Sequence, residues 1–280
     1  MTYVNRFIPA VVQPKEIEVP SLWFAFRGRR LLVQIEGRTA QVPYLTDFAQ
    51  LELTATRKQY LGTLNGKHCY SIEVEVEASP PQGWSFQGLR RLFDLMSEEV
   101  FWVASAALQI VDWDRNHQFC SHCGTGTVYR AKERAKECPI CGLLSYPRIS
   151  PAIIVLVERD DSLLLARSVR RPKGLYSVLA GFVEPGETLE TAVKREIREE
   201  VGISVTDIRY FGSQPWPFPD SLMIAFTCKY ASGELQLEEE EIVDAGWYTA
   251  ESLPPIPPRI SIARSLIEWF IFKQTKHTNG

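Results

Sequence analysis

The segment from residue 188 to residue 201 constrains the fold more than any other part of the chain. Its apolar side chains recur every four positions, which predicts a helix that packs one face on a core; they are Val193, Ile197 and Val201. Its glutamates stand at i, i+3 and i+4, so their carboxylates gather beside that face; they are Glu196, Glu199 and Glu200. The segment therefore predicts an amphipathic helix with concentrated negative charge on its polar side.

This concentration of carboxylates favours a bound cation. Three like charges at helical spacing repel one another, and several hard oxygen ligands suit Mg²⁺ or Mn²⁺. Arg195 can pair with Glu187 and so fasten the loop that follows Gly181 to the helix. Acidic runs on helices are often only solvated surfaces, so this alternative is weighed against the longer pattern around the helix.

The longer pattern extends from Gly181 to Ile203. It consists of a glycine, five residues, a glutamate, seven residues, Arg-Glu, an aliphatic residue, any residue, Glu-Glu, any residue, a glycine and an aliphatic residue. Its supporting positions are Gly181, Glu187, Arg195 and Gly202. The segment resembles the Nudix box without departure. The resemblance implies a hydrolase of nucleoside diphosphates linked to a further moiety, in which divalent ions lower the pKa of the attacking water.

Two CxxC pairs form a second site. Cys120 and Cys123 are separated by fourteen residues from Cys138 and Cys141. Tetrahedral zinc takes four thiolates from tight turns of this kind, and four thiolates leave no open position, so the predicted zinc is structural. The N-terminus does not resemble a secretory signal, which predicts a reducing, cytoplasmic compartment where grouped cysteines favour metal over disulfides.

The remaining patterns predict an α+β protein. Alternation over residues 68–78 predicts a half-buried antiparallel strand, and apolar spacing predicts a helix over residues 92–103. The apolar run at 152–157 should turn and return as a hairpin. More strands are expected at 208–211, 222–230 and 246–248, before a closing helix whose apolar face is Ile262, Leu266, Ile267 and Phe270. The expected domains are a β-rich N-terminal domain (1–112), a zinc ribbon (116–147) and a Nudix α/β/α sandwich (148–270).

Residues 213–223 alternate prolines with aromatic side chains. Prolines stiffen the segment, and the rings of Trp216 and Phe218 suit stacking on a base or a nicotinamide, although such loops often only pack. The segment resembles the fingerprint of the NADH pyrophosphatase family, also described as NAD-capped RNA hydrolases. The order of ribbon, box and fingerprint also matches that family over residues 117–270, whereas the first hundred residues match only as a divergent domain.

This resemblance implies the ligands of the divalent ion. Glu196 and Glu200 would hold it, with Glu199 beside them and the carbonyl of Ala180 as a further ligand. Glu241 matches another metal carboxylate of the family. It ends an acidic run that would by itself be read as a solvated loop.

The resemblance also implies substrate contacts. The segment that would hold substrate consists of Gln214, Pro215, Trp216, Pro217, Phe218, Pro219, Asp220 and Ser221. Tyr146 and Phe182 would flank the nicotinamide, and Ala263 on the last helix would line the pocket. Glu133 and Arg90 match further contacts, with Arg91 an equal candidate to Arg90.

Charge limits the partners. Lys and Arg number 31 against 34 Asp and Glu, a net charge of -3, so bulk binding of nucleic acid is not expected. One basic stretch predicts either a solubilising loop or a grip on phosphates beyond the cap; it consists of Arg167, Arg170, Arg171 and Lys173. The longest apolar run, residues 100–111, is too short to span a membrane, so no membrane partner is expected.

Together these patterns predict a zinc-containing Nudix hydrolase. The resemblance implies that it splits NAD(H) into nicotinamide mononucleotide and AMP, removes the NAD cap from RNA 5′ ends and works as a homodimer. One alternative is a Nudix pyrophosphatase for ADP-ribose or dinucleoside polyphosphates, against which the proline-aromatic segment argues. Another is an inactive zinc-ribbon regulator that binds nucleic acid. The complete set of box carboxylates and the acidic charge balance argue against it.

Overall fold

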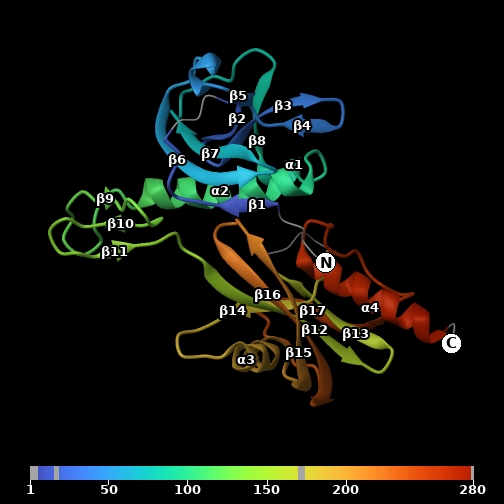
Figure 1. The fold of residues 1–280 in the computed structure, drawn as a ribbon. Helices are drawn as coiled ribbons and strands as arrows, with labels where there is room; N and C mark the ends of the chain where they lie inside the picture. The colour runs from blue at the N-terminus through green and yellow to red at the C-terminus, as the bar shows by residue number, and fades with distance from the viewer. Residues whose placement is uncertain (1–5, 16–18, 170–173, 279–280) are drawn as a thin grey trace. The chain divides into compact units, whose positions relative to one another are not determined.

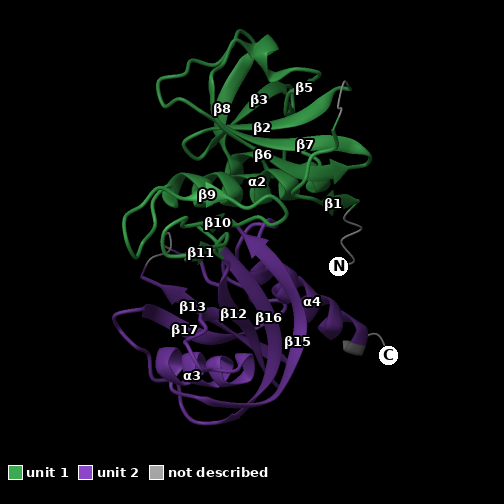
Figure 2. Ribbon diagram, turned by 60° about the vertical axis from the view of Figure 1, so that its left-hand side comes forward, with its two compact units in different colours: residues 1–148, 217–220 green, residues 149–216, 221–280 purple. Residues whose placement is uncertain are grey.

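The structure, a computed structural model, describes residues 6–15, 19–169 and 174–278 (Figure 1). The chain forms two compact units (Figure 2). Unit 1 contains residues 1–148 and 217–220, and unit 2 contains residues 149–216 and 221–280. The short stretch 217–220 therefore folds with unit 1, although the strands on either side of it belong to unit 2. Within the described ranges, no helix is long and apolar enough to cross a membrane.

Unit 1 is built on an eight-stranded sheet. Its strands are β1 (Phe7–Pro9), β2 (Ser21–Arg27), β3 (Arg30–Glu36), β4 (Thr39–Gln41), β5 (Tyr44–Leu45), β6 (Ala55–Leu64), β7 (Lys67–Val74) and β8 (Trp84–Gly88). The main order is β1-β6-β7-β2-β3-β4, with β5 beside β2 and β8 beside β3. Strands β2 and β7 are parallel, and their neighbours pair antiparallel.

Unit 1 also contains a 3-10 helix, η1 (Phe48–Leu51), and two α-helices, α1 (Leu89–Leu92) and α2 (Glu98–Asn116). The single helix expected over residues 92–103 is therefore wrong. The helical stretch is interrupted after Leu92, and a new helix begins after Ser97. Ser97 caps this helix, because its Oγ accepts a hydrogen bond from the Val100 amide at 3.4 Å. After α2 a three-stranded sheet follows, formed by β9 (Val128–Tyr129), β10 (Lys136–Glu137) and β11 (Leu144–Ser145).

Strand β7 corrects a second expectation. It ends at Val74, and Val76 beyond it is 74% exposed. Residues 69–74 are all buried rather than alternately exposed, because β6 and β2 flank the strand, an aromatic-rich cluster covers one face and α2 packs on the strand as well. The acidic side chain in this stretch, Glu73, is tolerated because it pairs with Arg57 and Arg115.

Unit 2 is an α/β/α sandwich, as the sequence predicts (Figure 1). Its strands are β12 (Ser150–Arg159), β13 (Ser162–Ser168), β14 (Leu179–Phe182), β15 (Ser204–Trp216), β16 (Ser221–Ser232) and β17 (Ile242–Thr249). Their order is β15-β16-β12-β13-β17, with β14 beside β12, and β12 runs parallel to β16. The two helices are α3 (Leu189–Val201) and α4 (Ile262–Thr278).

The apolar run in β12 explains the two helical layers. Successive side chains of a strand point to opposite faces of the sheet. Ile153, Val155 and Val157 pack with the apolar stripe of α3 in one cluster. Ile154 and Leu156 pack in the other cluster, which contains the whole predicted face of the closing helix α4. Alternate side chains of one strand thus fix both helices.

The segment expected to be a proline-aromatic loop is mostly strand. Residues 213–216 end β15, and residues 221–223 begin β16. Trp216 pairs with Ser221 across the hairpin, which leaves residues 217–220 as its tip. Strand β14 had no sequence signal, because its four residues, Leu-Ala-Gly-Phe, lack alternation.

Candidate active site

Helix α3 positions the predicted catalytic carboxylates. It begins after Thr188, whose Oγ1 accepts a hydrogen bond from the amide of Thr191 at 3.2 Å. It ends at Gly202, which adopts φ +76°, a conformation that favours glycine. Between these ends its apolar stripe is buried against the sheet. The helix is therefore fixed in length and rotation, and so are the directions in which its glutamates leave it.

Arg195 ties the segment before the helix to the helix itself. Its Nε and Nη2 donate to the two carboxylate oxygens of Glu187, at 2.7 and 2.9 Å, in a bidentate pair. Its Nη2 also donates to the carbonyl of Phe182, and its Nη1 donates to Glu196 and Glu199, each at 2.9 Å. The hydrogen bonds from Arg195 are the largest cause that lowers the pKa of Glu187, to about 2. The predicted pair of Arg195 and Glu187 is thus present.

Gly181 lets strand β14 approach Glu196. A Cβ on Gly181 would lie 1.9 Å from Cδ of Glu196, so a larger residue would displace this carboxylate. Burial raises the pKa of Glu196 more than Arg195 lowers it, and the charges of Glu199 and Glu241 add to the rise. Negative charge crowded in this way is relieved by a bound cation.

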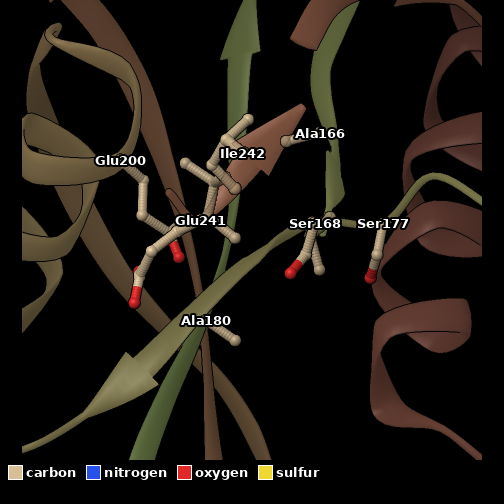
Figure 3. A pocket seen from close by; sticks show the side chains of 9 residues that line it. Ala166, Ser168, Ser177, Ala180, Glu200, Glu241 and Ile242 are labelled. Carbon is tan, nitrogen blue, oxygen red and sulfur yellow. The ribbon is translucent and has the colours of Figure 1, made fainter. Parts of the chain in front are cut away.

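Glu200 lines a cavity of about 240 Å³ in unit 2 (Figure 3). Its side chain is buried, 8% exposed. Ala180 and Glu241 line the same cavity. Glu241 reaches it because the chain before β17 is bonded to α3 and to the residue after β13. The Glu238 amide donates to the Glu200 carbonyl at 3.1 Å, and the Glu241 carbonyl accepts from the Val169 amide at 2.9 Å.

The donors in this region fit a hard divalent cation. The carboxylates of Glu196, Glu200 and Glu241 and the carbonyl of Ala180 are the oxygen ligands that Mg²⁺ or Mn²⁺ takes. They are not gathered as tightly as the sequence suggests: among the described residues, the group of three or more side chains placed closely enough to hold a metal ion is the four cysteines, not the glutamates. Glu199 is 59% exposed and pairs with Arg195, whereas Glu200 is buried.

The four predicted zinc ligands lie together. The sulfur atoms of Cys120, Cys123, Cys138 and Cys141 are all within 4.8 Å of one another, and all four thiols are free. Three S···S distances are 3.4, 3.6 and 3.8 Å. A tetrahedral zinc with Zn–S bonds of about 2.3 Å requires about 3.8 Å. The backbone amides of His122 and Cys141 also approach the sulfurs of Cys120 and Cys138, at 3.4 and 3.5 Å. The set fits structural zinc.

A buried ion pair fastens this ribbon to α2. Nζ of Lys136 on β10 lies 2.6 Å from Oδ1 of Asp114 on α2, and the two side chains are 2% and 1% exposed. Lys136 also donates to the Asp114 carbonyl at 2.9 Å, and the Tyr129 hydroxyl donates to the carboxylate at 2.7 Å. Burial opposes ionisation of Asp114, but hydrogen bonds from Lys136, Tyr129 and Gln59 outweigh it and lower its pKa. A satisfied polar network therefore supports the ribbon in addition to zinc.

Four predicted substrate contacts form two pairs in unit 1. In the ribbon, Tyr146 is 53% exposed and its hydroxyl donates to Glu133 at 3.1 Å. At the tip, Cζ of Arg90 lies 4.4 Å from the ring centre of Phe218, beside an open cavity of about 650 Å³. Arg91 lines the same cavity, and the stack on Phe218 favours Arg90 as the matching residue.

Three other predicted contacts are buried in unit 2. Gln214 is 3% exposed, and both ends of its amide are used: Nε2 donates to the Ile260 carbonyl at 2.9 Å, and Oε1 accepts from the Ile262 amide at 2.8 Å. Gln214 thereby holds the start of α4. Ser221 is buried, and Ala263 packs in the α4 core. In this structure all three support the scaffold rather than an open binding surface.

The remaining predicted positions are spread over several elements. Pro215 and Trp216 end β15, and Pro217, Pro219 and Asp220 are in the tip. Phe182 ends β14 and is 54% exposed. Of the basic stretch, Arg167 lies on β13. Its other members lie outside the described residues; they are Arg170, Arg171 and Lys173.

Comparison with known proteins decides the family. The NUDIX domain family matches residues 147–270. A protein of Pseudomonas fluorescens named NAD-capped RNA hydrolase NudC is 45% identical over 274 residues, which cover 98% of this chain and 97% of that protein. This chain is a Nudix hydrolase of the NAD-capped RNA hydrolase family. Proteins of the same name are 47% identical over 225 residues in Stutzerimonas stutzeri (80% of this chain, 81% of that protein) and 40% identical over 261 residues in Deinococcus radiodurans (90% of each).

Two further family matches of this Nudix hydrolase fall within unit 1. The NADH pyrophosphatase zinc ribbon domain matches residues 115–146, which contain the four cysteines. The NADH pyrophosphatase-like rudimentary NUDIX domain matches residues 20–113. Residues 20–113 therefore match a reduced Nudix domain, a relationship that the sequence patterns did not indicate.

Two residues of this Nudix hydrolase escaped the sequence analysis. Arg29, in the turn between β2 and β3, donates from Nη2 to the Pro217 carbonyl at 2.7 Å and pairs with Asp112, so it holds the tip within unit 1. Ser177 lines the same cavity as Glu200. Neither a single arginine in a turn nor a single serine has a spacing that could have marked it.

Proposed function

We propose that this Nudix hydrolase splits the pyrophosphate bond of NAD(H) into nicotinamide mononucleotide and AMP, and removes the NAD cap from RNA 5′ ends. The observation that carries this proposal is the cavity at α3, which Glu200, Glu241 and Ala180 line together. Support for the substrate comes from relatives over nearly the whole chain that are named NAD-capped RNA hydrolases. The same cut on capped RNA leaves a 5′-monophosphate.

In this proposal Glu196, Glu200, Glu241 and the Ala180 carbonyl hold the divalent cation. When bound, Mg²⁺ or Mn²⁺ would neutralise charge on the pyrophosphate and lower the pKa of the attacking water. Arg195 orients Glu196 by its hydrogen bond. A glutamate of the box accepts a proton from the water as the water oxygen bonds to phosphorus. The bridging P–O bond breaks, and a nucleoside monophosphate leaves with the bridging oxygen.

Three aromatic side chains are assigned to the substrate's planar rings. Phe182 and Tyr146 are exposed and Phe218 is half-buried, and each has a ring that suits stacking on a nicotinamide or a base. Arg90 beside Phe218 supplies a positive charge for a phosphate, and Glu133 holds the Tyr146 hydroxyl. The buried Gln214, Ser221 and Ala263 are assigned to the scaffold and not to direct contact.

Product analysis tests the proposal directly. NADH, NAD-capped RNA and ADP-ribose are digested side by side in ¹⁸O-labelled water, with Mg²⁺ and Mn²⁺ compared. We expect nicotinamide mononucleotide and AMP from NADH, 5′-monophosphate RNA from the capped RNA, and one labelled oxygen in one of each pair of products. Efficient cleavage of ADP-ribose with NADH and capped RNA left intact would overturn the substrate assignment.

We also propose a cytoplasmic homodimer with domain limits at 1–112, 116–147 and 148–270. A four-thiolate site needs a reducing compartment. The ribbon exposes large apolar side chains, including Ile140 (76%) and Phe119 (71%), which suit a protein partner. Light scattering on the zinc-loaded chain should give twice the 31.9 kDa chain mass, and a monomer mass at micromolar concentration would contradict the dimer.

A further inference from the structure

Ser177 is buried in the wall of the cavity that contains Glu200 and Glu241. Its side chain is 1% exposed, and in the part of the chain that the structure describes its Oγ has no hydrogen-bond partner. Burying a hydroxyl without a partner costs free energy, so proteins seldom keep one without a use for it. Because Ser177 lines this cavity, a ligand in the cavity can provide the missing partner.

The backbone fixes the position of this hydroxyl. The amide and carbonyl of Ser177 bond to the carbonyl and amide of Ala166 at 2.9 Å each, which attaches the residue to β13. Ser168, after a bulge in β13, lines the same cavity. Figure 3 shows Ser168 and Ser177 on one side of the cavity and Glu200 and Glu241 on the other.

The two sides of the cavity differ in chemistry. Glu200 and Glu241 bring negative charge, which repels a phosphate unless a cation lies between them. The opposite side brings neutral hydroxyl groups, and a hydroxyl can donate a hydrogen bond to an anionic oxygen. Val178, Leu179 and Ile242 also line the cavity and are apolar. A hydrogen bond from a hydroxyl to an anionic oxygen is stronger in such surroundings than in water.

We propose that Oγ of Ser177 donates a hydrogen bond to a phosphoryl oxygen of the pyrophosphate bound in this cavity. The hydroxyl then holds the phosphoryl group against the side opposite the carboxylates, and the bound substrate satisfies the buried hydroxyl. This inference rests on the proposed function, because it requires a pyrophosphate substrate at α3. A hydrogen bond to an anionic group corresponds to roughly ten- to hundredfold in affinity.

Ser71 offers a matched control for Ser177. It is also 1% exposed, and its Oγ also lacks a partner among the described residues, but it lies on β7 in unit 1. Ser177→Ala and Ser71→Ala each remove one such hydroxyl, so both should keep or slightly raise the Tm. We expect only Ser177→Ala to lower kcat/KM for NADH, by about ten- to hundredfold.

Binding without turnover is the decisive measurement. The Kd of a methylene-bridged NAD analogue is measured by calorimetry on the zinc-loaded protein with Mg²⁺ or Mn²⁺ present. We expect binding to Ser177→Ala to be weaker by about tenfold or more, and binding to Ser71→Ala to equal that of the wild type. Ser177→Thr should restore binding, whereas Ser177→Val, which has the shape of threonine without the hydroxyl, should not. Equal Kd values for wild type and Ser177→Ala, or equal values for the Thr and Val variants, would overturn the inference.

Failure of the proposed function looks different. A wild-type protein that cleaves neither NADH nor capped RNA would remove the function itself, whatever Ser177 does. A wild-type protein that cleaves both, while Ser177→Ala cleaves and binds equally well, would remove only the role of Ser177.

Discussion

The two units repeat one arrangement of strands. Unit 2 has the order β15-β16-β12-β13-β17 with β14 beside β12, and unit 1 has β6-β7-β2-β3 with β8 beside β3 and β5 beside β2. In each unit the two middle strands, β12 with β16 and β2 with β7, are parallel, and the flanking pairs are antiparallel. A long helix follows the last strand of the large sheet in both, α4 in unit 2 and, after the short α1, α2 in unit 1.

The units differ in the connection that leads to their fourth matching strand, β15 in unit 2 and β6 in unit 1. Between β14 and β15 the chain forms α3, with 13 residues, whereas between β5 and β6 it forms η1, with 4 residues and no acidic residue in its first turn. Phe48 and Leu51 of η1 are buried in an aromatic cluster in which Trp23 stacks on Tyr70 at 4.5 Å. The box carboxylates lie on α3, so the proposed hydrolysis is assigned to this connection and not to the strand arrangement that both units share.

The largest expected effect is a loss of activity on substitution in α3 that the corresponding change beside η1 does not cause. Glu200→Gln should lower turnover of NADH at least a hundredfold, about 3 kcal/mol or more, because it removes a carboxylate from the cavity while keeping the side-chain shape. Glu52→Gln, at the end of η1 in unit 1, is the control and should act as wild type. Steady-state kinetics with circular dichroism measure both, and a fast Glu200→Gln enzyme would remove the assignment.

The next effect belongs to unit 1. Cys120→Ser should lose the zinc and lower the free energy of unfolding of unit 1 by about 3 kcal/mol or more, since metal binding and folding of a four-thiolate site are coupled. Cys228→Ala, which alters a buried thiol in unit 2, should keep one zinc per chain. Elemental analysis and thermal unfolding measure the difference. Stoichiometric zinc in Cys120→Ser would refute the ribbon site.

A smaller effect tests the close approach of Gly181 on β14 to the Glu196 carboxylate in unit 2. Gly181→Ala should push the Glu196 carboxylate away and lower kcat/KM by about tenfold, roughly 1.4 kcal/mol, with little loss of stability because only the end of a flexible side chain moves. Gly212→Ala is the control, because a Cβ there meets nothing within 4 Å. Activity and activation by Mg²⁺ are measured, and parallel behaviour of the two variants would contradict the role of Gly181.

The smallest effect concerns the pair of Glu187 and Arg195. The pKa of Glu187 is lowered from 4.5 to about 2, so its contribution to stability is present above 4.5 and is lost as the pH falls through 2. Glu187→Gln should therefore be less stable than wild type at pH 6, and the gap should close between about pH 4.5 and pH 2. Urea unfolding at several pH values measures it. A gap independent of pH would show that the charge does not matter.

Unit 2 was predictable because its elements carry their own signals. The apolar period predicted α3 to within one residue, and the run at 152–157 lies inside β12. Unit 1 was less predictable. The alternation over residues 68–78 indicated β7, but not that residues 69–74 are all buried or that the strand ends at Val74. The likeness of unit 1 to unit 2 lies in strand pairing, which no local pattern records.

The sites divide in the same way. The cysteines and the box glutamates stand at short fixed spacings, so their positions could be read from the chain. The resemblance named Gln214, but not its bonds to the start of α4, because those partners lie 46 and 48 positions away. Ser177 had no signal, because a single serine has no spacing that marks it. Glu241 lay in an acidic run that reads as solvent-exposed, and its bonded neighbour Glu238 brings it to α3.

The tip at residues 217–220 has a consequence for dissecting the molecule. The chain passes between the units at 148/149, 216/217 and 220/221, so a single truncation point cannot divide it cleanly. A fragment starting at residue 149 would carry Phe218 without Arg90, and one ending at residue 148 would carry Arg29 without the Pro217 carbonyl. Unit 1 therefore cannot be removed as one continuous segment. Joining it to the Nudix domain of another hydrolase would also require residues 217–220 in place of the four corresponding residues of that domain.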